Sequence, residues 1–299
     1  MALEAALRKQ YGSQVSVQLV DFIRLATPWP WNASPEAYQA LGQFPSVYKR
    51  VWDHDQSSET WHDTSTFSMI WTFCRESILT FLVDAVGSGV DLIISVHPLI
   101  HHLVLEGLGE IFEGQNRGRK HGGRQKVLAV PVVTVVTDLG SAHLSWFDPR
   151  VHMLFVPSKE ILDLALKYNV PRKKIHLCGL PVREGFWSAI RPELGVRNRL
   201  QEQLGLRPTD RPEVILLMGG GEGFGKLVDV ATAIGNRLSR LGFGQMVVVC
   251  GRNEEVRKEL TQRTWPARRE GEWTFTPVIL GFVSNIDEYM TAADCLVTK

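Results

Sequence analysis

The sequence predicts an α/β protein built from two Rossmann-like domains that face each other across a cleft. Apolar strands rich in Val, Ile and Leu alternate along the chain with helical patterns, which is typical of parallel sheets covered by helices on both faces. A length of 299 residues suits two such domains. A segment rich in Pro, Arg and Glu separates the two series of strands, so we expect an N-terminal domain over 1–185, a linker over 186–212 and a C-terminal domain over 213–299.

Each element is predicted from a local pattern. Apolar runs predict strands in the first domain at Val15–Val20, Leu92–Val96, Val130–Thr137, Met153–Val156 and Ile175–Leu177. Similar runs predict strands in the second domain at Val214–Met218, Met246–Cys250, Val278–Leu280 and Cys295–Thr298. Helical periodicity predicts helices at Phe67–Ser88, Leu99–Phe112, Ser158–Tyr168, Lys226–Leu241, Glu254–Arg263 and Ile286–Ala293. The chain opens with an amphipathic helical pattern whose acidic Glu4 is unlike a secretory signal.

Composition excludes several classes of protein. With 44% hydrophobic residues, 22% charged residues and a formal net charge of +1, the chain has no global nucleic-acid signature. No apolar stretch approaches the roughly 20 residues that a membrane span requires. The four cysteines lie far apart without a C-x-x-C pair, which argues against a zinc site or a disulfide framework and favours small core residues.

The most informative segment is the strand Val214–Met218 together with the glycine-rich run that follows it. The run contains Gly219, Gly220, Gly221, Gly223 and Gly225, and a helical pattern begins at Lys226. A strand, a glycine turn and a helix N-terminus present bare backbone N–H groups, and the helix dipole favours negative charge there. The segment therefore predicts a phosphate site, the alternative being a turn that only closes the βα unit.

Polar side chains also gather where strands of the first domain end. His97 follows one strand, and Asp138 and His143 follow the next. Ligands of open α/β sheets bind beyond the carboxyl ends of the strands. His101 and His102 stand one turn after His97, but no carboxylate lies at ligand spacing beside them, so we expect cleft lining or helix capping rather than a metal site. Asp138 is a candidate base or ordering carboxylate, and a plain turn residue is the alternative.

Six motifs follow one another along the chain: VHPL at 96–99, VTDL at 136–139, GLPVR at 179–183, LLMGGGEG at 216–223, CGRN at 250–253 and GF at 281–282. This series, in this order and at similar spacings, resembles the monogalactosyldiacylglycerol synthase family over nearly the whole chain. The resemblance implies a GT-B type fold and inverting transfer of galactose from UDP-galactose to 1,2-diacylglycerol. It further implies a peripheral protein of the chloroplast envelope membrane that needs no cofactor and no metal.

The resemblance also assigns roles to residues. It implies UDP binding by Arg183, Gly219, Gly220, Gly221, Glu222, Gly223, Cys250, Gly251, Arg252, Gly281, Phe282 and Val283. Within this set the glycine run and Arg183 would hold the diphosphate, and the last six residues would line the uridine pocket. On the acceptor side it points to Pro30, His97, Asp138, His143 and Trp146. Leu144 departs from the family pattern, because plant relatives are expected to carry proline after the histidine.

A membrane surface is the second expected partner, since diacylglycerol stays in the bilayer. Rings that suit a membrane interface are Trp29, Trp31, Trp146 and Phe147. The stretch Gly114–Lys126 looks like a solvated, mobile insertion whose five basic residues would attract anionic lipid such as phosphatidylglycerol. The alternative is that the tryptophans belong to the core and the basic residues are simply solvated.

Both ends of the sequence bear on activity. In the family a GGGH motif carries the general base, and we expect it upstream of Met1. A loop that contacts the sugar is expected after Lys299. The chain then corresponds to a truncated synthase, without its own base and inactive alone. Glucosyl-diacylglycerol synthesis and a non-catalytic module that binds a nucleotide sugar or lipid are the alternatives, and a homodimer is compatible with the sequence.

Overall fold

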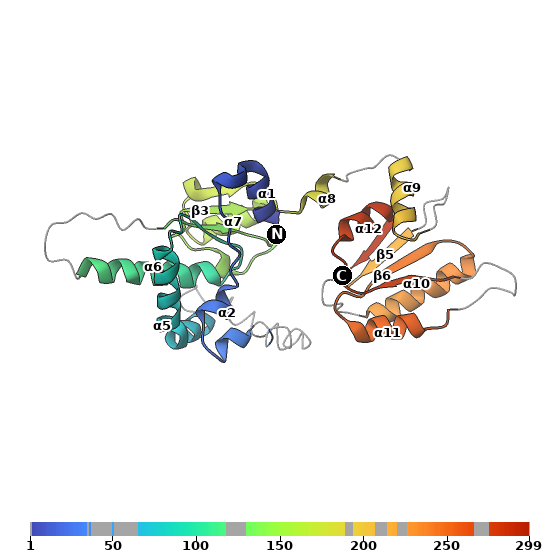
Figure 1. Cartoon of the computed structure of the whole chain (residues 1–299), viewed down its shortest axis with the longest axis horizontal. Coiled ribbons are helices and arrows are strands. Elements are labelled where there is room, and N and C mark those ends of the chain that lie inside the picture. The colour runs from blue at the N-terminus through green and yellow to red at the C-terminus, as the bar shows by residue number, and fades with distance from the viewer. Residues whose placement is uncertain are drawn as a thin grey trace. The chain divides into compact units, whose positions relative to one another are not determined.

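The computed structural model describes residues 2–34, 36, 50, 65–117, 130–188, 194–206, 214–219, 226–265 and 275–298. The chain divides into two compact units between Pro181 and Val182 (Figure 1). Each unit contains a parallel sheet of four strands. The predicted α/β class with two Rossmann-like sheets is therefore confirmed.

The N-terminal sheet has the strand order β1-β2-β3-β4. Its strands are β1 (Ile93–Ser95), β2 (Val132–Val135), β3 (Met153–Val156) and β4 (Ile175–Leu177). Ser95 pairs with Thr134, which in turn pairs with Leu154, so all the strands point the same way. These strands lie within the predicted apolar runs, because strands of a covered parallel sheet are apolar on both faces.

The predicted strand Val15–Val20 is wrong. Helix α1 (Ala2–Tyr11) and a 3-10 turn η1 (Gly12–Gln14) precede this segment, helix α2 (Phe22–Ala26) follows it, and the segment itself belongs to neither sheet. The Arg8 guanidinium donates to the carbonyl of Val17 at 3.0 Å, where a strand would accept from a neighbouring strand. Leu19 and Val20 are exposed, so the alternating pattern here does not mark a buried face.

Helices α5 (Ser65–Gly87), α6 (Ile100–Arg117) and α7 (Lys159–Lys167) surround the N-terminal sheet. The residues of α2, α5 and α6 form one core with Val132 and Ile93, and α7 forms a second core with β3 and β4. Gly107 lets α5 and α6 approach, because a Cβ at this position would overlap the side chain of Leu82. Helix α6 extends through Arg117, so residues 114–117 of the stretch predicted as a loop are helical. Residues 118–126 of that stretch lie outside the described residues.

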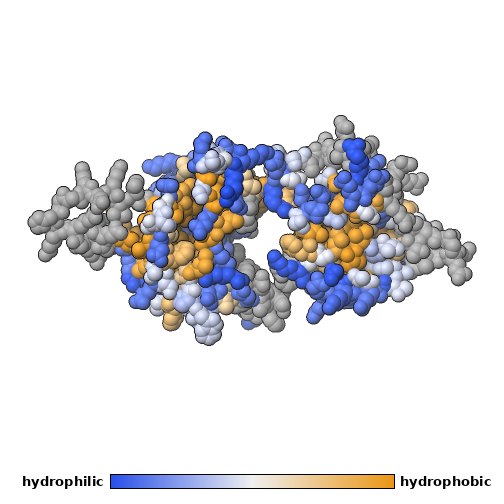
Figure 2. Space-filling model, in the orientation of Figure 1, coloured by the Kyte–Doolittle hydropathy of each residue, from blue (hydrophilic) through white to orange (hydrophobic). Residues whose placement is uncertain are grey.

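The C-terminal sheet has the order β7-β6-β5-β8. Its strands are β5 (Val214–Met218), β6 (Gln245–Val249), β7 (Val278–Leu280) and β8 (Cys295–Thr298). Helices α10 (Leu227–Leu241) and α11 (Glu254–Gln262) cover one face, and α9 (Leu194–Gln203) and α12 (Ile286–Ala292) cover the other (Figure 1). Figure 2 shows hydrophobic residues gathered over β5 and β6, with hydrophilic surface over α10 and α11.

This strand order locates the ligand site of the C-terminal unit. The chain runs from β5 outward to β6 and β7 and then returns to place β8 on the other side of β5. The strand order thus reverses between β5 and β8, and doubly wound sheets bind ligands beyond the carboxyl ends of the strands at such a point. Gly219 lies directly at this point, at the end of β5.

Part of the segment predicted as a linker is folded. Helix α8 (Glu184–Ser188) contacts α12, and Leu200 of α9 packs on the sheet together with Leu204, which follows the helix. The Gln201 side-chain amide donates to the Ala292 carbonyl at 2.9 Å. The C-terminal unit therefore includes ordered structure before its first strand.

Candidate functional site

The phosphate site predicted after β5 is described only at its first residue. Gly219 is buried, and α10 begins at Leu227 after exposed Lys226. Gly220, Gly221, Glu222 and Gly223 lie outside the described residues. The roles predicted for the glycine run therefore stay predictions, at a location that the strand order favours.

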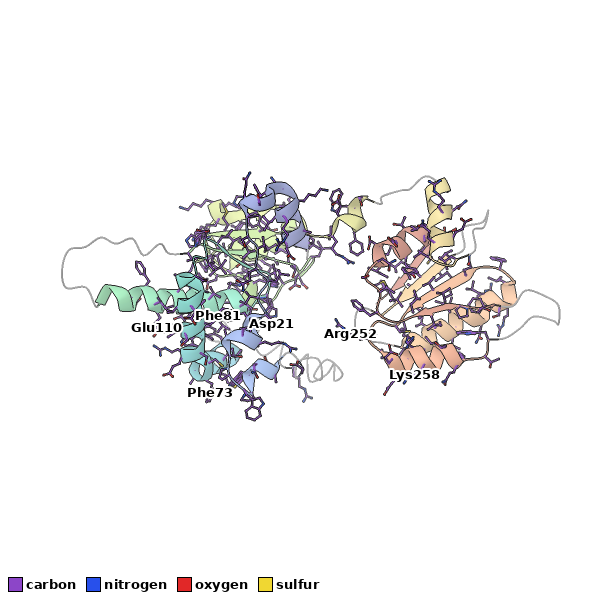
Figure 3. The ribbon with its side chains drawn as sticks, in the orientation of Figure 1. Asp21, Phe73, Phe81, Glu110, Arg252 and Lys258 are labelled. Carbon is purple, nitrogen blue, oxygen red and sulfur yellow. The ribbon has the colours of Figure 1, made fainter. Side chains whose placement is uncertain are left out.

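The carboxyl ends of β6 and β7 lie side by side, next to the end of β5. Most of the residues predicted for the uridine pocket follow these strand ends and therefore come together. The Cys250 N–H donates to the Leu280 carbonyl at 2.8 Å. Gly251 has a φ of 60°, which favours glycine, and its carbonyl lies 3.7 Å from a Cβ built on Gly281. The Arg252 guanidinium lies over the exposed ring of Phe282, 5.1 Å from the ring centroid. Figure 3 labels Arg252, which lies just beyond the end of β6.

The Cys250 thiol takes no part in polar chemistry at this edge. The residue is fully buried, and burial raises the pKa of its thiol to about 11. A thiol with this pKa stays protonated at neutral pH and is a poor nucleophile. The backbone of Cys250 is what this residue contributes to the site.

Arg183 lies against the same edge. Its Nη1 donates to the Ser284 carbonyl at 3.0 Å, one residue after Val283, and its guanidinium lies over the ring of Phe186 at 5.0 Å. Helix α8 holds this arrangement close to α12, because a Cβ at Gly185 would overlap the carboxylate of Asp287. The structure thus groups Arg183 with the predicted uridine residues, within the C-terminal unit. The exposed guanidinium is a cation of the kind that pairs with phosphate oxygens.

In the N-terminal unit, the loop after β2 contains three predicted acceptor residues, Asp138, His143 and Trp146. Trp146 donates its indole Nε1–H to Asp138 Oδ2 at 2.6 Å, and His143 Nδ1 lies 2.7 Å from Ser145 Oγ. Asp138 is half-buried and His143 is buried. The Asp138 carboxylate orients a buried ring, and its role as a base stays a prediction.

His97 lies at the end of β1, next to this loop. Its Nδ1 accepts from the Leu99 N–H at 3.2 Å, so the neutral ring carries its proton on Nε2. Surrounding protein desolvates the ring and lowers its pKa, while the charge of Asp138 acts in the opposite direction. His97 is therefore a neutral imidazole at pH 7 whose edge remains exposed.

Two of the four rings expected at a membrane are in the core. Trp146 is 2% exposed and Phe147 is 4% exposed, and Phe147 stacks on Tyr168 with centroids 5.4 Å apart. The prediction that these two rings insert into a bilayer is wrong, because the loop folds back and packs both on α7 and the sheet. Trp146 contributes to the site instead by holding Asp138.

The other two rings belong to an exposed apolar surface. Trp29 is 80% exposed, and Trp31 stacks on Phe73 of α5 with centroids 5.7 Å apart. Phe73 and Leu25 are 65% and 63% exposed, and Figure 3 shows Phe73 on the outside of α5. We call Leu25, Trp29, Trp31 and Phe73 the aromatic surface; Pro30 follows Trp29 within it. The sequence analysis missed Leu25 and Phe73, although a helix that is apolar all round its circumference signals contact on more than one side.

A buried cluster lies under the loop after β2, so the expectation that His101 and His102 line a cleft is wrong, and the partner Asp148 was not predicted. His102 Nδ1 lies 2.9 Å from Asp148 Oδ2, and its Nε2 lies 2.8 Å from the Ser145 carbonyl. Burial lowers the pKa of His102, and the hydrogen bond with Asp148 opposes this effect. The neighbouring His101 ring is fully buried with neither nitrogen hydrogen-bonded, and burial lowers its pKa well below the ordinary value.

Within the ranges that the structure describes, no three His, Cys, Asp or Glu side chains come together to hold a metal ion. In the same ranges, no helix has the length and apolar character needed to cross a bilayer.

Two parallel α/β sheets of four strands each are consistent with the two Rossmann-like halves of a GT-B fold. The family model described as monogalactosyldiacylglycerol (MGDG) synthase matches residues 1–113 and 119–182. The chain belongs to this family. The break at 114–118 falls within the stretch interpreted as an insertion.

Relatives with this name match the whole chain. Monogalactosyldiacylglycerol synthase, chloroplastic, of Spinacia oleracea is 33% identical over 307 residues, which cover 100% of this chain and 52% of the relative. Monogalactosyldiacylglycerol synthase 1, chloroplastic, of Arabidopsis thaliana is 31% identical over 302 residues, covering 100% of this chain and 51% of the relative. The chain thus spans about half the length of the curated relatives it matches.

Proposed function

We propose that this chain serves the transfer of galactose from UDP-galactose to 1,2-diacylglycerol, with inversion at the anomeric carbon. The observation that carries the proposal is the grouping of Arg183, Cys250–Arg252 and Gly281–Phe282 beside the switch point of the C-terminal sheet. These are the residues that the family resemblance links to UDP. Family membership supplies the reaction class.

In this proposal the C-terminal unit stabilises the leaving group. As the acceptor oxygen attacks the anomeric carbon, negative charge develops on the UDP diphosphate. The glycine run would offer backbone N–H groups at the start of α10, and Arg183 would add a fixed positive charge. These groups can neutralise the diphosphate without a metal ion. The Arg252–Phe282 pair offers a cation and a ring face to the uridine.

The N-terminal unit would receive diacylglycerol. The loop after β2 presents Asp138 and His143, and His97 stands beside it at the end of β1. These groups can bind and orient the 3-hydroxyl of the acceptor. The general base of the family, which removes the proton of this hydroxyl, would come from the GGGH motif, which is not among the 299 residues.

The acceptor stays in a bilayer, so we propose peripheral attachment to the chloroplast envelope. The aromatic surface is the described part of the chain that suits it, because exposed Trp and Phe rings settle at headgroup depth. The basic residues of the 114–126 stretch would add attraction to anionic lipid such as phosphatidylglycerol. Relatives of the chain are named chloroplastic.

Calorimetry with UDP tests the donor half of the proposal. The unmodified chain should bind UDP, and Arg183→Gln should weaken binding about tenfold, the loss typical of one charge-assisted contact. Arg237→Gln, an exposed arginine on α10 of the same unit, is the matched control and should leave the affinity unchanged. Equal UDP affinity for Arg183→Gln and the parent would contradict the donor site.

Transfer assays separate the alternatives. The chain is incubated with diacylglycerol and either UDP-galactose or UDP-glucose, and the glycolipid is identified. Preference for UDP-glucose would favour glucosyl-diacylglycerol synthesis. Binding of UDP without either glycolipid would favour the non-catalytic module that binds a nucleotide sugar over transfer by these residues. No binding of UDP or of diacylglycerol would contradict the whole proposal.

A further inference from the structure

The loop after β2 is tied together by its own side chains. Asp138 accepts from the Trp146 indole at 2.6 Å, and His143 contacts Ser145 at 2.7 Å. The short turn η4 (Leu144–Trp146) contains one member of each pair, Ser145 and Trp146, and all of its residues are buried. A displacement of Ser145 therefore moves His143 and Trp146, and through Trp146 it moves Asp138.

One side chain outside the loop holds Ser145 in place. The His102 ring on α6 is almost fully buried and has a polar partner at each nitrogen. Its Nε2 lies 2.8 Å from the Ser145 carbonyl, which can only accept, so Nε2 must carry a proton. The ring thus joins α6 to the middle of the loop.

The other nitrogen of His102 is anchored in turn. Asp148 Oδ2 lies 2.9 Å from Nδ1 and also accepts from Arg150 Nη2 at 2.8 Å. Arg150 reaches back to Glu106 at 2.8 Å, one helical turn after His102 on α6. The series therefore starts and ends on the same helix, which restricts rotation of the imidazole.

The charges of this cluster stabilise its hydrogen bonds. Burial alone would raise the pKa of Asp148, but the hydrogen bonds from His102 and Arg150 outweigh it and hold the pKa well below the usual range. The carboxylate is thus ionised at neutral pH and can only accept, so the contact with His102 requires a proton on Nδ1 as well as the one on Nε2. Neighbouring His101 makes no such link, since neither of its nitrogens is hydrogen-bonded.

We propose that His102 is a positioning residue for the acceptor side: by holding the Ser145 carbonyl, it sets the location of His143, Trp146 and Asp138. This inference rests on the proposed function, in which the loop meets diacylglycerol. His102 itself is buried beneath the loop and touches no substrate.

Two substitutions separate the two contacts of the ring. The amide nitrogen of Gln stands where Nε2 stands in histidine, and that of Asn stands where Nδ1 stands. His102→Gln therefore keeps a donor for Ser145, whereas His102→Asn keeps only the contact with Asp148. His176→Asn, on an exposed histidine of β4, is the matched control.

The experiment measures the NMR signal of the Trp146 indole N–H. This signal is assigned by its absence from the spectrum of Trp146→Phe. In His102→Asn its signal should shift and its solvent exchange should quicken about tenfold, as expected for loss of roughly one hydrogen bond that holds the loop. His102→Gln and His176→Asn should keep the parent signal. An unchanged indole signal in folded His102→Asn, or equal changes in the Gln and Asn variants, would overturn the proposal.

A second measurement needs no variant, in case His102→Asn does not fold. In the parent protein, the 15N shift of His102 should show a proton on Nε2 that exchanges slowly. A bare Nε2 at pH 7 would overturn the contact with Ser145 and with it the proposal.

Dioleoylglycerol in phosphatidylcholine bicelles tests the link to the acceptor, with bicelles lacking it as the reference. The parent indole signal should respond to dioleoylglycerol, and the response should weaken in His102→Asn but not in His102→Gln. Should the His102→Asn signal shift as expected while dioleoylglycerol has no effect on any variant, His102 would stand as the anchor of the loop and the acceptor role in the proposed function would fail.

Discussion

The hydrogen bond from Trp146 to Asp138 makes a prediction whose magnitude follows from the structure. The donor belongs to a ring that is 2% exposed, and the acceptor is a half-buried carboxylate 2.6 Å away. Hydrogen bonds to charged groups contribute about 1.5–3 kcal/mol. Solvent reaches part of the carboxylate, so we expect the lower end of this range, about 1.5 kcal/mol.

Single substitutions would mix this contribution with others. Trp146→Phe also leaves unfilled volume in the core, and Asp138→Ala also removes a charge near His97. A double-mutant cycle of the two, measured as free energies of unfolding in urea, isolates the pairwise coupling. The transition of the N-terminal unit is the one to follow, because a chain of two units need not unfold in one step.

The expected coupling energy is about 1.5 kcal/mol, and Trp29→Phe, on an exposed ring, should change stability by less than about 0.5 kcal/mol. A coupling below roughly 0.5 kcal/mol would refute the reasoning. It would mean that Asp138 is oriented by solvent rather than by the ring, and that burial of Trp146 serves packing alone.

Three further outcomes are expected. His101 has a pKa in the fold well below its ordinary value of 6.5, so its contribution to stability is complete above pH 6.5 and is lost as pH falls below it. The parent should lose up to about 1.4 kcal/mol more per pH unit than His101→Gln, as followed by urea midpoints between pH 7 and 5; parallel curves would contradict this. Gly107→Val should destabilise by about 1–3 kcal/mol through collision with Leu82 in thermal melts, and an unchanged midpoint would show that α5 gives way freely. Replacing Trp29 and Phe73 with Ser should reduce flotation with phosphatidylglycerol vesicles, and undiminished flotation would exclude the aromatic surface as the anchor.

The sequence was sufficient for the strands of both sheets because each is a short apolar run covered on two sides. It failed at Val15–Val20, where an apolar run has no sheet neighbour and its carbonyl accepts from Arg8 instead. Periodicity describes what a strand can bury and not whether a partner strand lies beside it. Leu25 and Phe73 of the aromatic surface were missed for the same reason, since the exposure of Phe73 depends on what packs around α5.

The candidate site divides in a similar way. The motifs that follow the strands brought Arg183 and Arg252 to one edge, as a parallel sheet requires. The pair His102–Asp148 was invisible because 46 residues separate its members along the chain. The location of Trp146 in the core depends on a loop that folds back, and no local pattern encodes that return.

Because α8 packs on α12, Arg183 belongs to the C-terminal unit. The motif that contains this arginine begins in the N-terminal unit, at Gly179. The Arg183 guanidinium nevertheless donates to the Ser284 carbonyl, and Gly185 of the following helix α8 packs closely against Asp287. Bending of the chain is therefore expected before Val182. Arg183 is therefore fixed to the unit that contains the C-terminal sheet. Under the proposed function, a UDP bound to the C-terminal unit would therefore meet this cation within a single body, and its release would require breaking the contact with Arg183 itself.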